Sequence, residues 1–337
     1  SGGGSDPAVA PPTGGGDAAS AVALSINITG VSINSPPVVS FDIRNQAGVG
    51  VASLVAADLR FNIAKLSPGS NGAPSAWQNY ISKAVNGAVQ GSQEQSAAGF
   101  AFGTLVNRGN GSYIYTFATD IRNPAANPCP APCTDAEGRP LDISYQPGLT
   151  HRVAIQQANG AYPPASGVYD FVPAGGAVTT TRDIVATAQC NECHGEVTMS
   201  GTNRVDTRLC ATCHNPGSWI AGTPNTSLDF KSQSHKMHIG ANLPSVKAGY
   251  SNRIGSRDFT KTTFVQDVRN CTKCHDGTRG AANATAQGDN WKMQPNIAAC
   301  GACHDDVYFG AQPDPTKPYQ TRAHQGGVMT DSSTCAL

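Results

Sequence analysis

The chain has 337 residues, a formal net charge of zero and only 14% charged residues. The absence of a basic field argues against a nucleic-acid partner, and no run of 18 apolar residues is available to span a membrane. The 37 Gly and 23 Pro favour turns and β-structure over long helices, and the length allows two domains.

Residues 1–20, SGGGSDPAVAPPTGGGDAAS, are rich in Gly and Pro. They bury too little apolar surface to offset their ordering entropy, so we expect a flexible tether. A Gly/Ser-rich start of this kind follows the acylated Cys of bacterial lipoproteins, although a cloned or frayed terminus explains it equally simply.

Residues 21–185 carry alternating apolar and polar residues separated by turn-rich segments such as 107–111. This pattern predicts an all-β domain, either an antiparallel sandwich or a Greek-key barrel. One helical turn is expected at 75–84, behind a Ser cap. The expected strands include residues 24–28, 38–43, 59–63, 113–117 and 149–155.

Cys129 and Cys133 flank Pro-Ala-Pro in a Pro-rich loop of this domain. Two Cys four residues apart can close a small ring, and we expect a structural disulfide. A redox switch and free thiols are the alternatives.

The motif Cys-x-x-Cys-His occurs four times after residue 186. Its two thiols can add to the vinyl groups of one haem, and the adjacent His then becomes the proximal iron ligand. Zinc or redox dithiols would not need a His at the same offset four times, although the first gap also suits a zinc ribbon. The words are Cys190, Cys193 and His194; Cys210, Cys213 and His214; Cys271, Cys274 and His275; Cys300, Cys303 and His304.

The chain ends in Cys335-Ala336-Leu337, which match the first three positions of the same motif. We therefore interpret the sequence as truncated in a fifth motif. The expectation is four covalently bound haem c groups, or five if the chain continues past Leu337.

Residues 186–337 are polar and rich in Gly, Asn and Thr. Such a segment cannot bury a large side-chain core, so we predict a loop-rich multihaem domain with short helices, whose core is made by closely packed porphyrins. Covalent haem and a disulfide both point to a location outside the cytoplasm.

Four His remain as candidates for the second axial position. His235 and His238 are spaced i, i+3 and would lie on one side of a helical turn, facing two porphyrins. His324 is followed by Gln-Gly-Gly, which lets a haem approach the backbone. His151 shares a strand face with apolar residues, which suits a core His as well as a haem ligand.

These residues resemble a known family, the outer-membrane decahaem c-type cytochromes of the OmcA/MtrC type. The resemblance covers about residues 31–337 and rests on several short matches. They are Ala64-Lys65-Leu66, Thr150-His151-Arg152-Val153, Phe171-Val-Pro-Ala-Gly-Gly176, Arg182-Asp-Ile-Val185, Cys213-His-Asn-Pro-Gly217, His235-Lys-Met-His238 through Val246, and Val268-Arg-Asn-Cys271 through His275.

The resemblance implies a lipoprotein on the extracellular face of the outer membrane, although a periplasmic or secreted protein is an alternative. It implies other multihaem cytochromes or a porin–cytochrome complex as partners, and metal oxides, chelated metal ions or flavins as electron acceptors. In one place the chain departs from the family. Thr198-Met-Ser-Gly201 replaces a Leu-His-Gly type segment, and Ser200 cannot supply an imidazole.

We therefore expect a multihaem electron carrier, with any metal or flavin reduction being unspecific. One alternative is a multihaem reductase with an open iron position, which would need polar donors around that position. The other is a subunit of a cytochrome filament.

Overall fold

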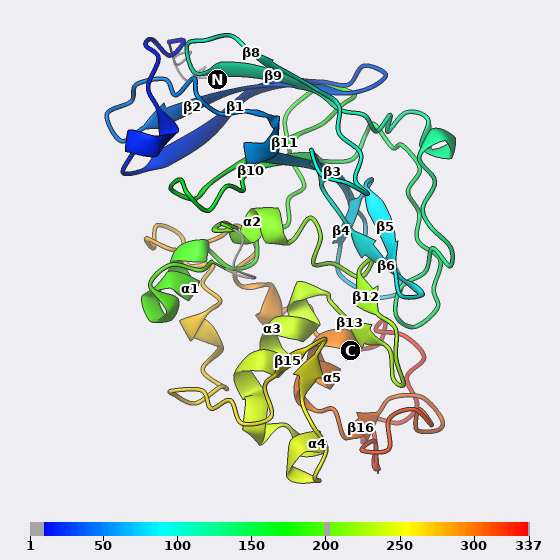
Figure 1. Ribbon diagram of the computed structural model, residues 1–337. Coiled ribbons are helices and arrows are strands. Elements are labelled where there is room, and N and C mark those ends of the chain that lie inside the picture. The colour runs from blue at the N-terminus through cyan, green and yellow to red at the C-terminus, as the bar shows by residue number, and fades with distance from the viewer. Residues whose placement is uncertain (1–9, 199–202, 336–337) are drawn as a thin grey trace.

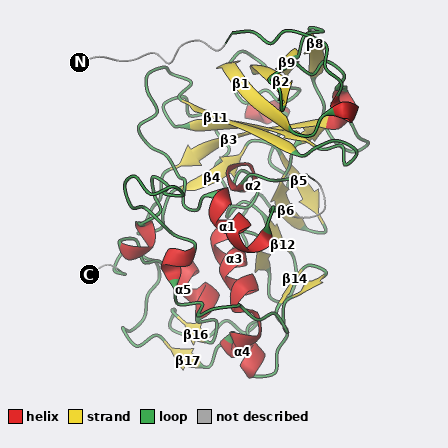
Figure 2. Ribbon diagram, turned by 90° about the vertical axis from the view of Figure 1, so that its left-hand side faces the viewer, coloured by secondary structure: helices red, strands yellow, loops and turns green. Residues whose placement is uncertain are grey.

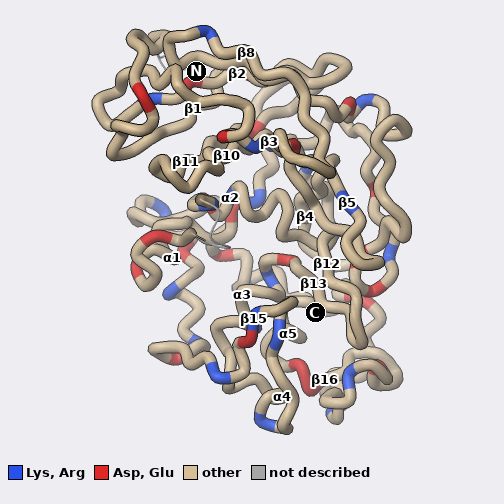
Figure 3. The backbone as a smooth tube through the Cα atoms, in the orientation of Figure 1, with Lys and Arg blue, Asp and Glu red and all other residues tan. Residues whose placement is uncertain are grey.

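The computed structural model describes residues 10–198 and 203–335. In Figure 1 a β-rich part lies above a helix-and-loop part. The long sheets use residues 24–171, and the α-helices of the described segments begin at residue 187. Figure 2 shows these short helices among long loops beneath the sheets, and Figure 3 shows Lys and Arg interspersed with Asp and Glu in both parts. The sequence prediction of antiparallel β-structure with a few short helices is thus confirmed.

One layer of the β-rich part is a four-stranded antiparallel sheet. Its strand order is β1 (Leu24–Ser32), β2 (Val38–Asn45), β9 (Ser112–Thr116) and β8 (Thr104–Asn107). Along the first strand, Leu24, Ile26 and Ile28 are buried and the residues between them are exposed. That alternation is typical of a sheet with one face on a core and one face in water.

The second layer is a five-stranded antiparallel sheet that is buried more completely. Its path is β11 (Ala165–Phe171), β10 (His151–Gln157), β3 (Leu59–Ser67) and β4 (Ala76–Asn79), with β7 (Glu94–Gln95) also paired to β3. Every residue of β10 is buried. A strand buried on both faces requires a covering layer on each side.

Aromatic side chains fill the space between the two layers. The Phe61 ring of β3 stacks on Tyr115 of β9 at a centroid distance of 3.7 Å and meets Phe41 of β2 edge-on at 5.7 Å. At the other end, Gly167 of β11 faces Ile26 of β1 so closely that a Cβ would lie 2.7 Å from the isoleucine side chain. The two sheets therefore share one hydrophobic core.

Smaller elements complete the fold. The remaining helices and strands are η1 (Ala18–Ser20), η2 (Ala56–Asp58), β5 (Ser82–Val85), β6 (Ala88–Gly91), η3 (Pro124–Ala126), α1 (Thr187–His194), α2 (Thr207–Cys210), β12 (Trp219–Ile220), β13 (Thr226–Ser227), α3 (Phe230–Ile239), η4 (Gly240–Asn242), α4 (Pro244–Lys247), β14 (Arg253–Ile254), β15 (Arg257–Asp258), η5 (Cys271–Lys273), η6 (Asn290–Lys292), α5 (Ile297–Cys303), β16 (Val307–Tyr308) and β17 (Arg322–Ala323). No helix within the described residues is both long and apolar enough to cross a bilayer.

The helical turn predicted at 75–84 is wrong, because this segment forms β4 and β5. Trp77 pairs with Leu66 of β3 in an antiparallel ladder. The helix-like spacing of the large side chains is coincidental here. A strand that extends a buried sheet gains pairing and packing that outweigh local propensity.

The predicted tether, residues 1–20, lies partly outside the described residues, and its later half is anchored. The Gly16 amide donates to the Gly50 carbonyl at 2.7 Å, and the Ala18 side chain is fully buried. In the Pro-rich loop, Cys129 and Cys133 are joined by a disulfide.

His151 lies in the sandwich core, and its interpretation as a haem ligand is therefore corrected. Its Nε2 is 2.7 Å from the Tyr80 hydroxyl and its Nδ1 is 2.8 Å from the Leu149 carbonyl. The side chain is fully buried. Both ring nitrogens have partners on a face that points into the β-rich part, so the core alternative holds.

Burial lowers the pKa of His151 to about 4, and Lys65 adds to this effect, while the hydrogen bond to Leu149 opposes it. A His whose folded pKa lies below its unfolded value stabilises the fold above about pH 6.5, and this contribution is lost as pH falls toward 4.

Lowering the pH from 7 to 5 should therefore reduce the free energy of unfolding of the parent protein by about 2 kcal/mol more than that of His151→Gln. The glutamine amide does not titrate in this range. Denaturant unfolding of both proteins at the two pH values measures the difference. Parallel pH profiles would contradict the buried neutral state of His151.

Candidate haem-binding site

The four Cys-x-x-Cys-His words all lie in the helix-and-loop part, and each adopts a helical turn. Motif 1 (Cys190–His194) ends α1, motif 2 (Cys210–His214) begins in α2, motif 3 (Cys271–His275) lies on η5, and motif 4 (Cys300–His304) ends α5. A helical turn brings residues i, i+3 and i+4 to one side. Two Cys and the following His of one word thus face the same space.

Backbone hydrogen bonds within the words hold this arrangement. In motifs 2, 3 and 4 the His amide donates to the carbonyl of the first Cys at 2.8, 2.9 and 2.8 Å. Side-chain caps begin two of the turns: Asp206 accepts from the Arg208 amide at 2.9 Å, and Asn296 accepts from the Ala299 amide at 2.9 Å. These caps satisfy amides that a helix start leaves free.

Helix α3 carries the predicted distal pair, and the structure brings each member to a different word. The rings of His238 and His194 have centroids 6.1 Å apart. The rings of His235 and His275 have centroids 6.2 Å apart. The i, i+3 pair therefore faces motif 1 with one imidazole and motif 3 with the other.

These separations fit two imidazoles on opposite sides of one iron. A metal–imidazole bond is about 2.0 Å long and the ring centre lies about 1.2 Å beyond the nitrogen, so trans axial rings have centroids about 6.4 Å apart. The His238 Nδ1 lies 2.8 Å from the Ser234 carbonyl, which leaves Nε2 for the metal. A ligating His commonly donates its other nitrogen in this way.

His214 and His324 are also oriented through Nδ1. The His214 Nδ1 lies 3.1 Å from the Leu228 carbonyl, and the His324 Nδ1 lies 3.1 Å from the Gly327 carbonyl. His324 directly follows β17, which pairs with β16 just beyond motif 4. Its role as a distal ligand stays a prediction. Ser200 lies outside the described residues.

Motifs 1, 3 and 4 are neighbours in space, in that order. Glu192 of motif 1 forms an ion pair with Lys273 of motif 3. Burial, and then the nearby sulfur of Cys193, raises the pKa of Cys274. Burial raises the pKa of Cys303 to about 11, and Cys271 of motif 3 is among its neighbours.

Cys335 lies beside motif 4. The pKa of Cys300 is raised mainly by burial, and the nearby Cys335 sulfur raises it further. This places the predicted start of a fifth word against the fourth word.

Motif 2 occupies a different place, because it packs on the outer face of the five-stranded sheet. Ala211 lies on a small cluster formed by Ala64, Leu66 and Trp77. We call this outer face, with Asn62, Ala64, Asn79 and Arg152, the docking face. Motif 2 provides the second cover that the buried strands β3 and β10 require.

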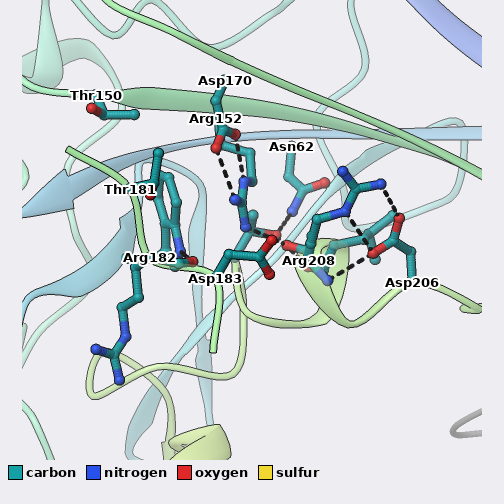
Figure 4. Close-up of polar contacts among 12 residues, drawn as sticks. Asn62, Thr150, Arg152, Asp170, Thr181, Arg182, Asp183, Asp206 and Arg208 are labelled. Carbon is teal, nitrogen blue, oxygen red and sulfur yellow. Dashed lines mark hydrogen bonds and ion pairs between the residues drawn. The ribbon is translucent and has the colours of Figure 1, made fainter. Parts of the chain in front are cut away.

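Arg152 connects the docking face to the turn before motif 2, as Figure 4 shows. Its guanidinium makes two bonds to Asp170, at 2.6 and 2.9 Å, and donates to the Arg208 carbonyl at 3.1 Å. It also lies 4.1 Å from the centre of the Trp77 ring. A planar, paired guanidinium can be buried at such a border where a lone charge could not.

The sequence reasoning did not find Asn62, Asn79 and Arg152. In an alternating strand a polar residue is expected to face water, and nothing in the pattern shows that motif 2 covers this face. The signal was present only in Thr150-His151-Arg152-Val153, which was singled out for the resemblance.

A family model, the outer membrane cytochrome MtrC/MtrF-like domains II/IV, matches residues 182–337. The multiheme cytochrome MtrC of Shewanella baltica (strain OS185) is 30% identical over 293 residues, which is 83% of this chain and 36% of that protein. The chain belongs to the OmcA/MtrC cytochrome family.

Solved structures agree with this assignment at the level of the fold. The crystal structure of the outer membrane decaheme cytochrome OmcA has a TM-score of 0.69 and 24% identity, covering 92% of this chain and 47% of that one. The structure of MtrC from Shewanella baltica OS185 has a TM-score of 0.61 and 26% identity, covering 93% and 42%. The chain thus spans less than half the length of these family members.

The ion pair between Glu192 and Lys273 generates a test of the packing between motifs 1 and 3. Lys273→Glu places two carboxylates side by side and should lower the denaturant midpoint, whereas the double reversal Glu192→Lys with Lys273→Glu should recover most of the loss. The interaction free energy between residues 192 and 273 should become smaller in high salt, because both side chains are partly exposed. A double variant as unstable as the single one would contradict the pairing.

Proposed function

We propose that the chain carries four covalently bound haem c groups, one on each Cys pair, with His194, His214, His275 and His304 as proximal ligands. His238 then completes the iron of motif 1, and His235 completes that of motif 3. The two centroid separations of 6.1 and 6.2 Å carry this proposal. His324 is proposed as a third distal ligand, and Cys335 as a further haem-attachment cysteine.

Two regions are proposed as domains: residues 21–185 as the β-domain and residues 186–337 as the haem domain, with 1–20 preceding them. The family match beginning at residue 182 supports the second boundary. The two kinds of core support it too. Among the described residues that form or pack on the hydrophobic clusters, only Ala211 comes from beyond residue 185.

The function we infer is electron transfer along these haems. Each bound haem supplies a one-electron ferric/ferrous couple. The chain's contribution is positional: α3 holds one imidazole toward motif 1 and one toward motif 3, and motif 4 lies next to motif 3. With an imidazole on each side, these two irons would have no open position for a substrate, which favours a carrier over a reductase.

We propose extracellular metal oxides, chelated metal ions and flavins as the final acceptors, and other multihaem cytochromes or a porin–cytochrome complex as partners. The outer-membrane location named for the family model and for OmcA supports this setting. A lipid anchor on the outer cell surface belongs to the same proposal.

The ligand pairs predict distinct spin-state changes. His238→Ala should convert one haem from low to high spin through loss of the imidazole opposite His194, and His235→Ala should convert a different one. Electron paramagnetic resonance of the oxidised proteins counts the high-spin iron. His151→Gln is the matched control and should leave every signal in place, because that ring lies in the β-core. A low-spin spectrum unchanged in His238→Ala would refute the pairing.

A carrier and a reductase differ on an electrode. A protein film should show overlapping reversible one-electron waves over a broad potential range, because several low-spin haems of differing exposure titrate together. Reduced protein should be reoxidised by both flavins and chelated ferric iron. A saturable, cyanide-sensitive catalytic wave for one small substrate would instead establish a reductase.

A further inference from the structure

Motif 2 is more deeply enclosed than the other words. Cys210 is buried, whereas Cys193, Cys274 and Cys300 are exposed. Its Thr212 is fully buried, at 0% exposure. The residues that enclose motif 2 come from the docking face of the β-rich part. The other motifs lie in the helix-and-loop part, where motifs 1 and 3 face α3.

Strand register places two carboxamides on that face. Asn62 of β3 lies two residues from Ala64, and Ala64 pairs with Asn79 of β4. Residues two apart on a strand share a face, so Asn62, Ala64 and Asn79 all point toward motif 2. Asn62 pairs across the sheet with Ala154. The small alanines beside the two amides leave room for the backbone of the word.

Both amides donate to motif 2. The Asn79 Nδ2 lies 3.4 Å from the Cys213 sulfur and 3.0 Å from the Ser92 carbonyl. The Asn62 Nδ2 donates to the Thr212 hydroxyl oxygen and lies 3.8 Å from the same sulfur. These distances place two N–H groups around one cysteine.

The orientation of the Asn62 amide is fixed by its partner. The Thr212 hydroxyl donates to the Leu209 carbonyl at 2.6 Å, so its oxygen must accept, and only the Nδ2 end of Asn62 can donate. The Oδ1 of Asn62 is buried without a hydrogen-bond partner in the described residues. A buried, half-satisfied amide costs stability that an apolar residue would not, which points to a role for its N–H groups.

We propose that Asn62 and Asn79 are positioning residues for the haem attached through Cys210 and Cys213, and that through them the β-rich part sets the reduction potential of this one haem. The inference rests on the proposed haem attachment. The N–H groups fix the sulfur that anchors the ring and direct the positive ends of their dipoles toward it. Such dipoles favour the reduced iron, which carries less positive charge.

Asn79→Leu removes one pair of donors at similar volume, and its combination with Asn62→Leu removes both. The potential of a single haem should become more negative in Asn79→Leu and more negative still in the double variant. Protein-film voltammetry and a redox titration followed by electron paramagnetic resonance measure the shift. If the leucine variants do not mature, Asn79→Ser should shift the same haem in the same direction, because its hydroxyl is too short to reach the sulfur.

Gln157→Leu is the matched control. It removes another fully buried amide from β10, on the opposite face of the same sheet, where its Nε2 holds the Asn159 and Pro163 carbonyls at 3.0 and 2.9 Å. All haem potentials should match those of the parent in this variant. If Asn79→Leu leaves all potentials unchanged, or shifts all of them together, the proposal fails.

The affected haem is identified with His214→Met, which replaces the proximal imidazole of motif 2 by a thioether. A thioether in place of an imidazole raises the potential of a haem, so its wave should separate from the rest. Adding Asn79→Leu must then shift the separated wave and no other. The pyridine haemochrome count and the mass of the peptide spanning motif 2 test haem attachment independently. A missing haem there would overturn the proposed function rather than the role of the amides.

Discussion

The alternation of side chains along β10 and β3 is the constraint on which the arrangement of the molecule depends. Both strands are buried on both faces, so neighbouring residues enter different environments. His151 faces the aromatic core and bonds to Tyr80, while Arg152, one residue on, faces motif 2 and bonds to the Arg208 carbonyl. One sheet is therefore both half of a sandwich and the support for motif 2.

The helix-and-loop part follows a different principle. Its buried hydrophobic residues, such as Leu209, Trp219 and Ile239, are scattered, and the hydrophobic clusters of the described residues lie elsewhere. A polar segment of this size needs another source of cohesion. Bound haems would provide it, because the α3 imidazoles lie opposite the His of motifs 1 and 3 at the spacing of axial ligands.

Sequence reasoning succeeded where local pattern and tertiary environment agree. The strand containing Leu24, Ile26 and Ile28 alternates as a one-sided strand should, and the i, i+3 spacing of His235 and His238 needs only one helical turn. It failed at Trp77, where strand pairing overrode a helix-like spacing. It also missed Asn62 and Arg152, because a polar residue in an alternating strand predicts exposure, and only the tertiary structure shows what covers that face.

The two parts are mechanically joined at motif 2. The Cys213 sulfur accepts from Asn62 and Asn79 of the docking face, while the Phe230 amide at the start of α3 donates to the His214 carbonyl at 3.1 Å. Asp229, the cap of α3, is itself buried. The helix that carries His235 and His238 thus begins on the backbone of motif 2, which packs on the sheet. A displacement of the β-rich part would act on motif 2 and, through this hydrogen bond and the contact of the His214 ring with Phe230, on the start of α3.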